Sequence, residues 1–309
     1  MTRFTRAALL AGAAAAALTA CGSSAASDDD AGGLTFAAVP SEQNIDPNAE
    51  YEDIIGLIEK NTGRKVTFVR STDYNAVIEG MVSGKIDIAE FGPLSYVLAR
   101  ANGAKITPVA AMVEKGEAPT YHSYGVVPKD STITSLAGFK GKKVCFVDPS
   151  STSGYLFPSA GLQQAGVDPR TGVKPVMAGG HDSSALSVKD GKCDAGFSLQ
   201  SMVDSVLPAK KELARGDLKA VWKSPAIPAS PIAIRTDLPG DVRAKLTSTF
   251  TRDANKDRMV ALGVCEDAAS CKVTSDPSYW GYQAIDDKAF DPVRQVCAAT
   301  RNDKCSKAA

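Results

Sequence analysis

The chain has 309 residues and equal numbers of acidic and basic side chains, 35 of each, so its formal net charge is zero. This balance gives no strong attraction to nucleic acid or to an anionic membrane surface, and neither is expected as a charge-driven partner. The seven cysteines and two histidines lack the Cys-x-x-Cys spacing of a structural zinc site, so neither a metal nor a cofactor is expected.

Residues 1–20 have the pattern of a secretory signal. Arg3 and Arg6 precede an uncharged apolar run at 7–18, which is too short to span a bilayer as a mature helix. The run ends in Leu-Thr-Ala-Cys, which resembles the lipobox of bacterial lipoproteins. That resemblance implies cleavage before Cys21, lipidation of its thiol and an extracytoplasmic protein anchored to the cell membrane. Ordinary secretion with an unmodified Cys21 is the alternative. The small, polar and acidic segment 21–33 predicts a flexible tether.

Strands and helices alternate along the rest of the chain. Short apolar runs predict strands at 34–39, 65–69, 86–89, 109–113, 124–127, 143–147, 173–177, 194–199 and 232–234. Amphipathic or capped segments predict helices from 51 to near 63 and at 74–82, 153–164, 182–188, 202–213 and about 237–255.

This alternating order predicts an α/β fold of two lobes, each a mainly parallel sheet flanked by helices. We expect residues 34–121 and 236–309 to form lobe 1 and residues 122–235 to form lobe 2. Ligands of such folds bind beyond the carboxyl ends of the strands, so the cleft between the lobes is the expected site.

Six cysteines remain once Cys21 is set aside, an even number in an oxidising compartment. Cys265 lies close to Cys271 in the sequence, and Cys297 lies close to Cys305. This leaves Cys145 to pair with Cys193. We therefore favour these three disulfides, although six cysteines allow fifteen connectivities.

The strongest chemical signal is Asp-Pro-Ser-Ser-Thr-Ser-Gly at 148–154, between a predicted strand and a predicted helix. A helix N-terminus presents unpaired N–H groups and a partial positive charge. The hydroxyls of Ser151, Thr152 and Ser153 add donors without adding net charge. Plain N-capping is the simpler interpretation, but it needs only one hydroxyl. The turn therefore predicts a site for a tetrahedral oxyanion.

Two further segments follow predicted strands in the same way. Gly-Gly-His-Asp-Ser-Ser at 179–184 places His181 after the strand at 173–177, and Phe91-Gly92-Pro93 follows the strand at 86–89. Pro93 suits the first position of a helix and leaves the following N–H groups available. The sequence contains neither a Walker P-loop nor a Gly-x-Ser-x-Gly elbow, so no catalytic residue is expected.

Together, Phe91-Gly92-Pro93, Ser151-Thr152-Ser153-Gly154, His181 and Gly191–Ala195 resemble the substrate-binding proteins of phosphonate, phosphite and phosphate ABC importers. The resemblance extends from residue 34 to about residue 256. It implies the two-lobed type II periplasmic-binding-protein fold. It also implies that Ser151, Thr152 and Ser153 hold the phosphoryl oxygens while His181 donates another hydrogen bond. The remaining candidates for ligand contact are Tyr74, Phe91, Glu42, Glu90, Ser95 and Tyr121.

The resemblance also implies a monomer that captures a small oxyanion and delivers it to a membrane permease with a cytoplasmic ATPase. Phe91, where aminoalkylphosphonate binders have tyrosine, predicts an apolar wall that favours phosphonate or phosphite. Glu42 or Glu90 could instead accept a proton from a ligand hydroxyl and favour phosphate; a sulfonate ranks third. An exported hydrolase using Ser151 or Ser153 with His181 is the rival class, and a surface lipoprotein without a ligand is another.

Overall fold

The computed structural model describes residues 32–43, 47–274, 276–300, 302, 304 and 305. The predicted signal peptide, Cys21 and nearly all of the predicted tether lie outside this part of the chain. Within it, no helix is long and apolar enough to cross a membrane.

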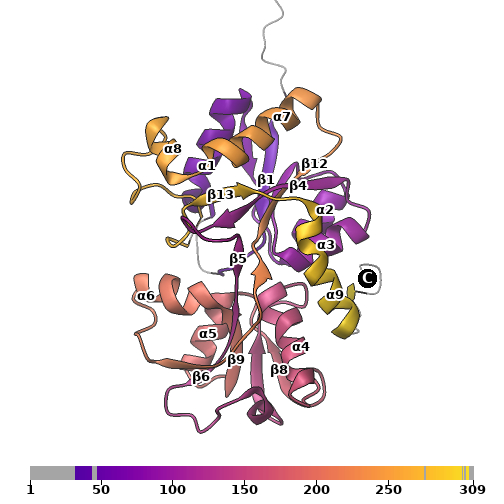
Figure 1. The fold of residues 1–309 in the computed structure, drawn as a ribbon, viewed down its shortest axis with the longest axis vertical. Coiled ribbons are helices and arrows are strands. Elements are labelled where there is room, and N and C mark those ends of the chain that lie inside the picture. The colour runs from indigo at the N-terminus through magenta and orange to yellow at the C-terminus, as the bar shows by residue number, and fades with distance from the viewer. Residues whose placement is uncertain (1–31, 44–46, 275, 301, 303, 306–309) are drawn as a thin grey trace, which may run out of the picture. The chain divides into compact units, whose positions relative to one another are not determined.

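Two sheets divide the described chain into two lobes (Figure 1). The first lobe is built on a six-stranded sheet in the order β13-β4-β12-β3-β1-β2. Its strands are β1 (Leu34–Ala38), β2 (Val66–Phe68), β3 (Ile88–Glu90), β4 (Ile106–Val113), β12 (Pro231–Arg235) and β13 (Gly281–Ala284). Its helices are α1 (Pro47–Thr62), α2 (Tyr74–Val82), α3 (Pro93–Ala101), α7 (Gly240–Ser248), η5 (Thr249–Asp253), α8 (Lys256–Ala261), η6 (Asp287–Phe290) and α9 (Asp291–Thr300).

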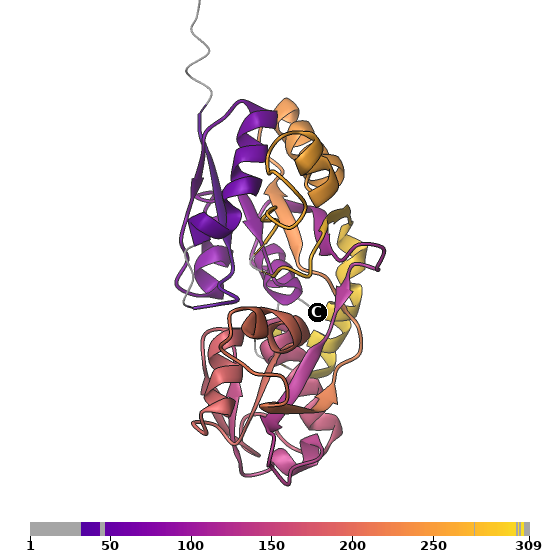
Figure 2. The ribbon, with the colours of Figure 1, turned by 90° about the vertical axis from the view of Figure 1, so that its left-hand side faces the viewer.

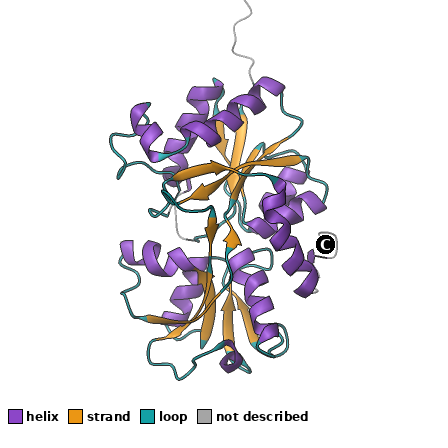
Figure 3. Ribbon diagram, in the orientation of Figure 1, coloured by secondary structure: helices purple, strands orange, loops and turns teal. Residues whose placement is uncertain are grey.

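Helices cover both faces of this sheet (Figure 3). Successive side chains of a strand point to opposite faces, so each strand can pack against the helices on both sides. In β1, Phe36 packs with residues of α1 and α7 in one core cluster. Its neighbour Ala37 packs with residues of α2, α3 and α9 in the other. The central strands are therefore buried on both sides, which accounts for their nearly continuous apolar sequence.

The second lobe is built on a five-stranded sheet in the order β10-β6-β9-β7-β8. Its strands are β6 (Ser123–Pro128), β7 (Lys143–Phe146), β8 (Lys174–Met177), β9 (Ala195–Leu199) and β10 (Leu218–Lys223). Its helices are η2 (Leu136–Phe139), η3 (Thr152–Leu156), α4 (Phe157–Gln164), α5 (His181–Lys189), η4 (Met202–Val206) and α6 (Leu207–Ala209).

The chain crosses between the lobes through two short strands that pair with each other, β5 (Thr120–Tyr121) and β11 (Ile227–Pro228). Figure 2 shows these connections on one side of the molecule, with α9 beside them. Helix α9 contacts α3 of the first lobe and both η3 and α4 of the second. Helix α9 and the two crossing strands thus join the lobes on this side.

The two-lobed α/β architecture is confirmed, and most strands of each sheet run in the same direction, although both sheets also contain antiparallel pairs. In the first lobe, β1 pairs in parallel with β2 and β3, whereas β12 and β13 pair antiparallel with their neighbours. In the second lobe, β7 is parallel to β8 and β9, and β6 is antiparallel to β9 and β10. The antiparallel pairs involve β4, β6, β10 and β12, which are the strands that lead into and out of the crossing. No helix reverses the chain between these strands and the crossing.

One predicted boundary also falls on the wrong side of a strand. The sequence-based division assigned residues up to 235 to the second lobe. In the structure β12 lies between β3 and β4 of the first lobe. The chain has already crossed at β11, so β12 can complete the first sheet.

All three favoured disulfides are present. Cys145 of β7 is bonded to Cys193, which lies just before the neighbouring strand β9, with 5.9 Å between their Cα atoms. Cys265 is bonded to Cys271, and Cys297 of α9 is bonded to Cys305. The last pair fixes the chain beyond α9 to the helix that joins the lobes.

We expect peptide mapping of the non-reduced protein to recover these three cross-linked pairs. Alkylation without reduction should label none of the six cysteines, because each sulfur is already bonded. Labelling of Cys145 in the native protein would contradict the assignment.

Candidate functional site

A small buried cavity of about 60 Å³ lies between the lobes. The second lobe contributes Ser151, Thr152, Ser153 and His181 to its wall, and the first lobe contributes Tyr74, Glu90, Gly92, Asp276 and Tyr279. Tyr121 of β5 closes it at the crossing. The volume suits a few non-hydrogen atoms, so the ligand must be small.

The serine-threonine turn is held in shape by its own hydrogen bonds. Asp148 Oδ1 accepts from the Ser150 N–H at 2.7 Å, and Ser151 Oγ accepts from the Gly154 N–H at 3.0 Å. The helix that follows begins as one wide π-helical turn, η3, and continues as α4. Gly154 is required here, because a Cβ at this position would lie 2.3 Å from Val147 Cβ.

This helix start supplies donors to the cavity. The first N–H groups of a helix have no acceptor within it, which leaves the amides of Thr152 and Ser153 for a ligand. Ser151 and Thr152 each use an oxygen lone pair within the protein, so their hydroxyl hydrogens remain for donation. All three hydroxyl-bearing residues are 1–2% exposed. The turn can therefore enclose an oxyanion with neutral donors.

A second helix N-terminus approaches from the opposite lobe. Gly92 caps α3, Pro93 is its first residue, and the Leu94 N–H donates to Thr152 Oγ1 at 2.7 Å. Both helix starts thus meet at Thr152 and bring two positive dipole ends together. Among the described residues that line the cavity, none is lysine or arginine. Attraction for an anion comes from dipoles and N–H or O–H groups.

His181 begins α5 and is held in one tautomer. The Leu199 N–H donates to its Nδ1 at 2.9 Å, so the ring hydrogen must be on Nε2. Complete burial lowers the pKa of His181 to about 3, and the ring is neutral at physiological pH. His181 is therefore a neutral donor in the cavity wall.

We expect the His181 ring to show no titration between pH 5 and pH 8. Its nitrogen chemical shifts should report a neutral Nε2–H tautomer throughout this range. An imidazolium signal from His181 at pH 6 would contradict this prediction.

The cavity tyrosines are also neutral donors. Burial raises the pKa of Tyr121 to about 12 and raises the pKa of Tyr74 further. Tyr74 interacts with Ser151, and Tyr121 interacts with Thr152 and Ser153. These two phenols thus extend the donor set of the turn.

Glu90 is the exception in this donor-rich wall. It is 7% exposed at the end of β3. Its Oε1 accepts from the Tyr51 hydroxyl at 3.0 Å, and its Oε2 accepts from the Tyr282 hydroxyl at 2.9 Å. Burial raises the pKa of Glu90 to about 7 in spite of these two bonds.

Three predicted residues do not line the cavity. Phe91 is fully buried and packs edge-on to Tyr96 in the first-lobe core, because the side chain after Glu90 points to the other face of the sheet. Ser95 donates to the Gly92 carbonyl at 2.9 Å and stabilises the start of α3. The apolar wall that we expected from Phe91 is therefore absent.

Glu42, the third, forms an ion pair with Lys210 of the second lobe. It belongs to a first-lobe loop that docks across the cleft. Gln43 donates from its backbone to Asp182 Oδ2 at 3.0 Å, and the Ser41 carbonyl accepts from the His181 N–H at 2.8 Å. This loop thus joins the lobes opposite the crossing strands.

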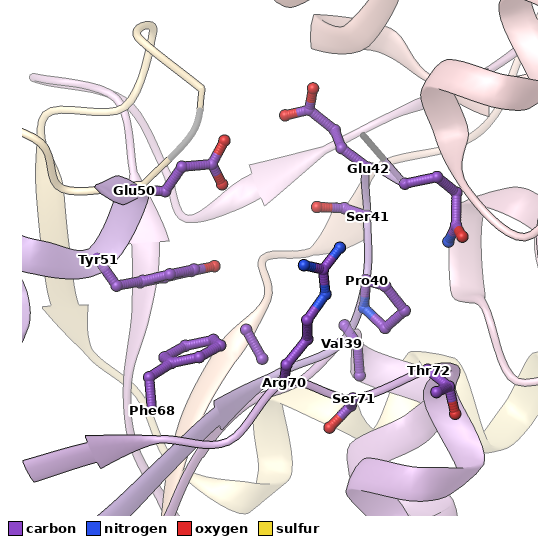
Figure 4. Close-up of a pocket in the computed structure, with 12 residues that line it drawn as sticks. Val39, Pro40, Ser41, Glu42, Glu50, Tyr51, Phe68, Arg70, Ser71 and Thr72 are labelled. Atoms are coloured by element: carbon purple, nitrogen blue, oxygen red, sulfur yellow. The ribbon is translucent and has the colours of Figure 1, made fainter. Parts of the chain in front are cut away.

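A larger cavity of about 360 Å³ adjoins the first one and shares Val39 and Ser41 with it. Figure 4 shows the Arg70 side chain extending into this space, with Glu50, Tyr51 and Phe68 around it. Arg70, Tyr51, Tyr282 and Asp276 are cavity or near-cavity residues that were not predicted from the sequence. Tyr51 fits the apolar repeat of a helix, and only the fold reveals its hydroxyl beside Glu90.

Comparison with known proteins agrees with this geometry. Residues 36–286 match the family model described as ABC transporter, phosphonate, periplasmic substrate-binding protein. The "Phosphate-import protein PhnD" of Mycolicibacterium smegmatis is 46% identical over 281 residues, which cover 88% of this chain and 87% of that protein. The "Phosphonates-binding periplasmic protein" of Escherichia coli is 32% identical over 216 residues, 68% of this chain and 62% of that protein.

Solved structures give the same answer for the fold. A binding-protein component of an ABC phosphonate transporter from Pseudomonas aeruginosa superposes with a TM-score of 0.75 at 28% identity, covering 87% of this chain and 86% of that chain. PhnD1 from Prochlorococcus marinus in complex with methylphosphonate gives 0.71 at 21% identity, covering 87% and 98%. The chain belongs to the family of periplasmic substrate-binding proteins of phosphonate ABC transporters.

Proposed function

We propose that this protein captures a small phosphorus oxyanion outside the cytoplasm and delivers it to the permease of an ABC importer. The observation that carries the proposal is the meeting of two helix N-termini at Thr152, inside a buried cavity lined by neutral donors. Such a site stabilises an anion through hydrogen bonds and dipoles, and its small volume limits the ligand to a few atoms.

The relatives support phosphorus as the central atom. Their names specify phosphate import in M. smegmatis, phosphonates in E. coli and phosphite in P. marinus. Phosphonate and phosphite are therefore the first candidates for this chain. Inorganic phosphate is the second, and the position of Glu90 favours it, because a carboxylate in the wall can accept from a P–OH group.

Binding without chemistry is part of the proposal. A serine hydrolase needs a histidine that takes a proton from the serine while a third group orients its other nitrogen. His181 Nδ1 instead accepts from a backbone amide, so Nε2 carries the hydrogen and cannot act as the base. The same arrangement suits a donor to a bound oxyanion.

The remaining features of the proposal concern the whole protein. We infer that Cys21 carries the lipid anchor, that the tether at 21–33 lets a monomer reach its permease, and that the lobes close on the ligand. Donors come from both lobes, which supports closure, since Thr152 and His181 lie in the second lobe and Tyr74 lies in the first.

Calorimetric titration of the protein lacking its signal peptide tests the function. Methylphosphonate, phosphite and phosphate should bind at one saturable site, while each should remain intact after prolonged incubation. Binding of methanesulfonate with no response to any phosphorus oxyanion would contradict the proposal. Release of products at catalytic protein concentration would favour the hydrolase instead.

A further inference from the structure

We propose that Glu90 and Asp276, which we call the acidic wall, make this site specific for oxyanions that carry a proton on one oxygen. The inference rests on the proposed function and deepens it, because it names the chemical form of the ligand. A P–OH group satisfies it, whereas sulfate and sulfonates, which have no such hydrogen at neutral pH, do not.

Glu90 is held in a fixed position. Tyr51 on α1 and Tyr282 on β13 each donate to a different carboxylate oxygen, at 3.0 and 2.9 Å. Above pH 7 Glu90 is ionised, and each oxygen of an ionised carboxylate has more than one acceptor position. Glu90 is therefore oriented by the protein and still able to accept from a ligand in the cavity.

Asp276 contributes an acceptor without a partner in the described part of the chain. It lines the same cavity and is 7% exposed. Its Oδ1 accepts from both the N–H and the hydroxyl of Ser278, at 3.0 and 2.7 Å. Its Oδ2 is buried and has no hydrogen-bond partner among the described residues. An orphaned buried acceptor is costly, and a donor on the ligand would satisfy it.

The charged groups of the described cavity lining are all acidic. The described cavity lining contains two carboxyl groups and neither lysine nor arginine. An anion with no proton on any of its oxygens would be repelled by these carboxylates and could not donate a hydrogen bond to them. A proton on one ligand oxygen turns the same contact into a charge-assisted hydrogen bond. The acidic wall therefore favours an oxyanion that carries a proton over one that does not, through attraction of the first and repulsion of the second.

Competition calorimetry at pH 8, where Glu90 is ionised and phosphate still carries one P–OH group, tests this inference with phosphate, phosphite, methylphosphonate, sulfate and methanesulfonate. The unaltered protein should prefer phosphate over sulfate by at least ~100-fold, a ratio that follows from gaining one charge-assisted hydrogen bond and losing one repulsion. Equal affinities for phosphate and sulfate in this protein would overturn the inference without any variant.

The variant Glu90→Gln should weaken phosphate binding roughly 10-fold or more and strengthen sulfate binding, because the amide can donate to an oxygen without a proton. Asp276→Asn should also lower the ratio of phosphate affinity to sulfate affinity. This variant replaces Glu90→Gln as the test if Glu90→Gln does not fold. The matched control is Glu59→Gln on the outer part of α1, where Glu59 accepts from the Val66 N–H at 3.0 Å.

The outcomes separate this inference from the proposed function. If phosphorus oxyanions bind but both wall variants keep the original ratio, the acidic wall is refuted and the function stands. If no phosphorus oxyanion binds the unaltered protein, the function itself fails. Preference for an aminoalkylphosphonate over every ligand with P–OH alone would show that the wall serves an ammonium group, which would also overturn the inference.

Discussion

Thr152→Ala is expected to weaken binding of the phosphorus oxyanion by roughly 10- to 100-fold, the equivalent of one hydrogen bond to a charged group. We expect the hydroxyl of Thr152 to donate to the ligand while its oxygen accepts from the Leu94 N–H of the other lobe at 2.7 Å. Its removal costs a ligand contact and leaves a first-lobe amide without its acceptor. Titration calorimetry measures the loss.

Thr152→Ser is the matched control, because it keeps the hydroxyl and removes only a methyl group. We expect its affinity to stay within a few-fold of the original. Equal binding by the alanine and serine variants would show that the hydroxyl takes no part in ligand capture.

Glu90→Gln is expected to change the pH dependence of stability in the ligand-free protein. Burial raises the pKa of Glu90 to about 7, so between the ordinary carboxyl range and pH 7 the folded state holds a proton that the unfolded state has lost. The free energy of unfolding of the original protein therefore falls as pH rises through this window. This shift in the pKa of Glu90 corresponds to about 3 kcal/mol of unfolding free energy, which the original protein loses across the window. The glutamine variant has no such group and should not lose it.

Urea denaturation of both proteins between pH 4.5 and pH 8 measures this difference. The neighbouring titratable groups, Tyr51, Tyr282, Tyr279, Glu50 and Asp276, are common to both proteins and cancel in the comparison to first order. His181, whose lowered pKa acts in the opposite direction, cancels as well. Parallel stability profiles would contradict a raised pKa at Glu90.

The parts of the site that the sequence predicted are those built within one short segment. The serine-threonine turn at 151–153 could be predicted as part of the cavity wall, because a strand, a run of hydroxyls and a helix follow one another directly. His181 could be inferred for the same reason. In each case the backbone of a few residues sets both the local structure and the direction of the donors.

The parts that could not be predicted depend on contacts distant in sequence. Glu90 is oriented by Tyr51 on one side and by Tyr282, 192 residues later, on the other. Phe91 shows the converse error, since adjacent residues of a chain leaving β3 face opposite sides and the motif alone does not say which faces the cleft. Asp276 lies after both crossings between the lobes, in a segment whose sequence shows no regular pattern.

The mixed sheets have a similar cause. Alternating strands and helices predict parallel pairing when every strand returns through a helix. Here β4 runs on through β5 into β6, and β10 returns through β11 into β12, so the crossing strands pair antiparallel. Nothing in the local sequence of these strands distinguishes a crossing from a return.

A crystal structure of the protein with bound phosphate or methylphosphonate tests the account most directly. We predict that the phosphorus lies in the small cavity, with its oxygens within hydrogen-bonding distance of the Thr152 and Ser153 amides and of His181 Nε2, and with any P–OH group directed at Glu90. An anion held instead by Arg70 in the larger neighbouring cavity, with the turn at 151–153 empty, would contradict it.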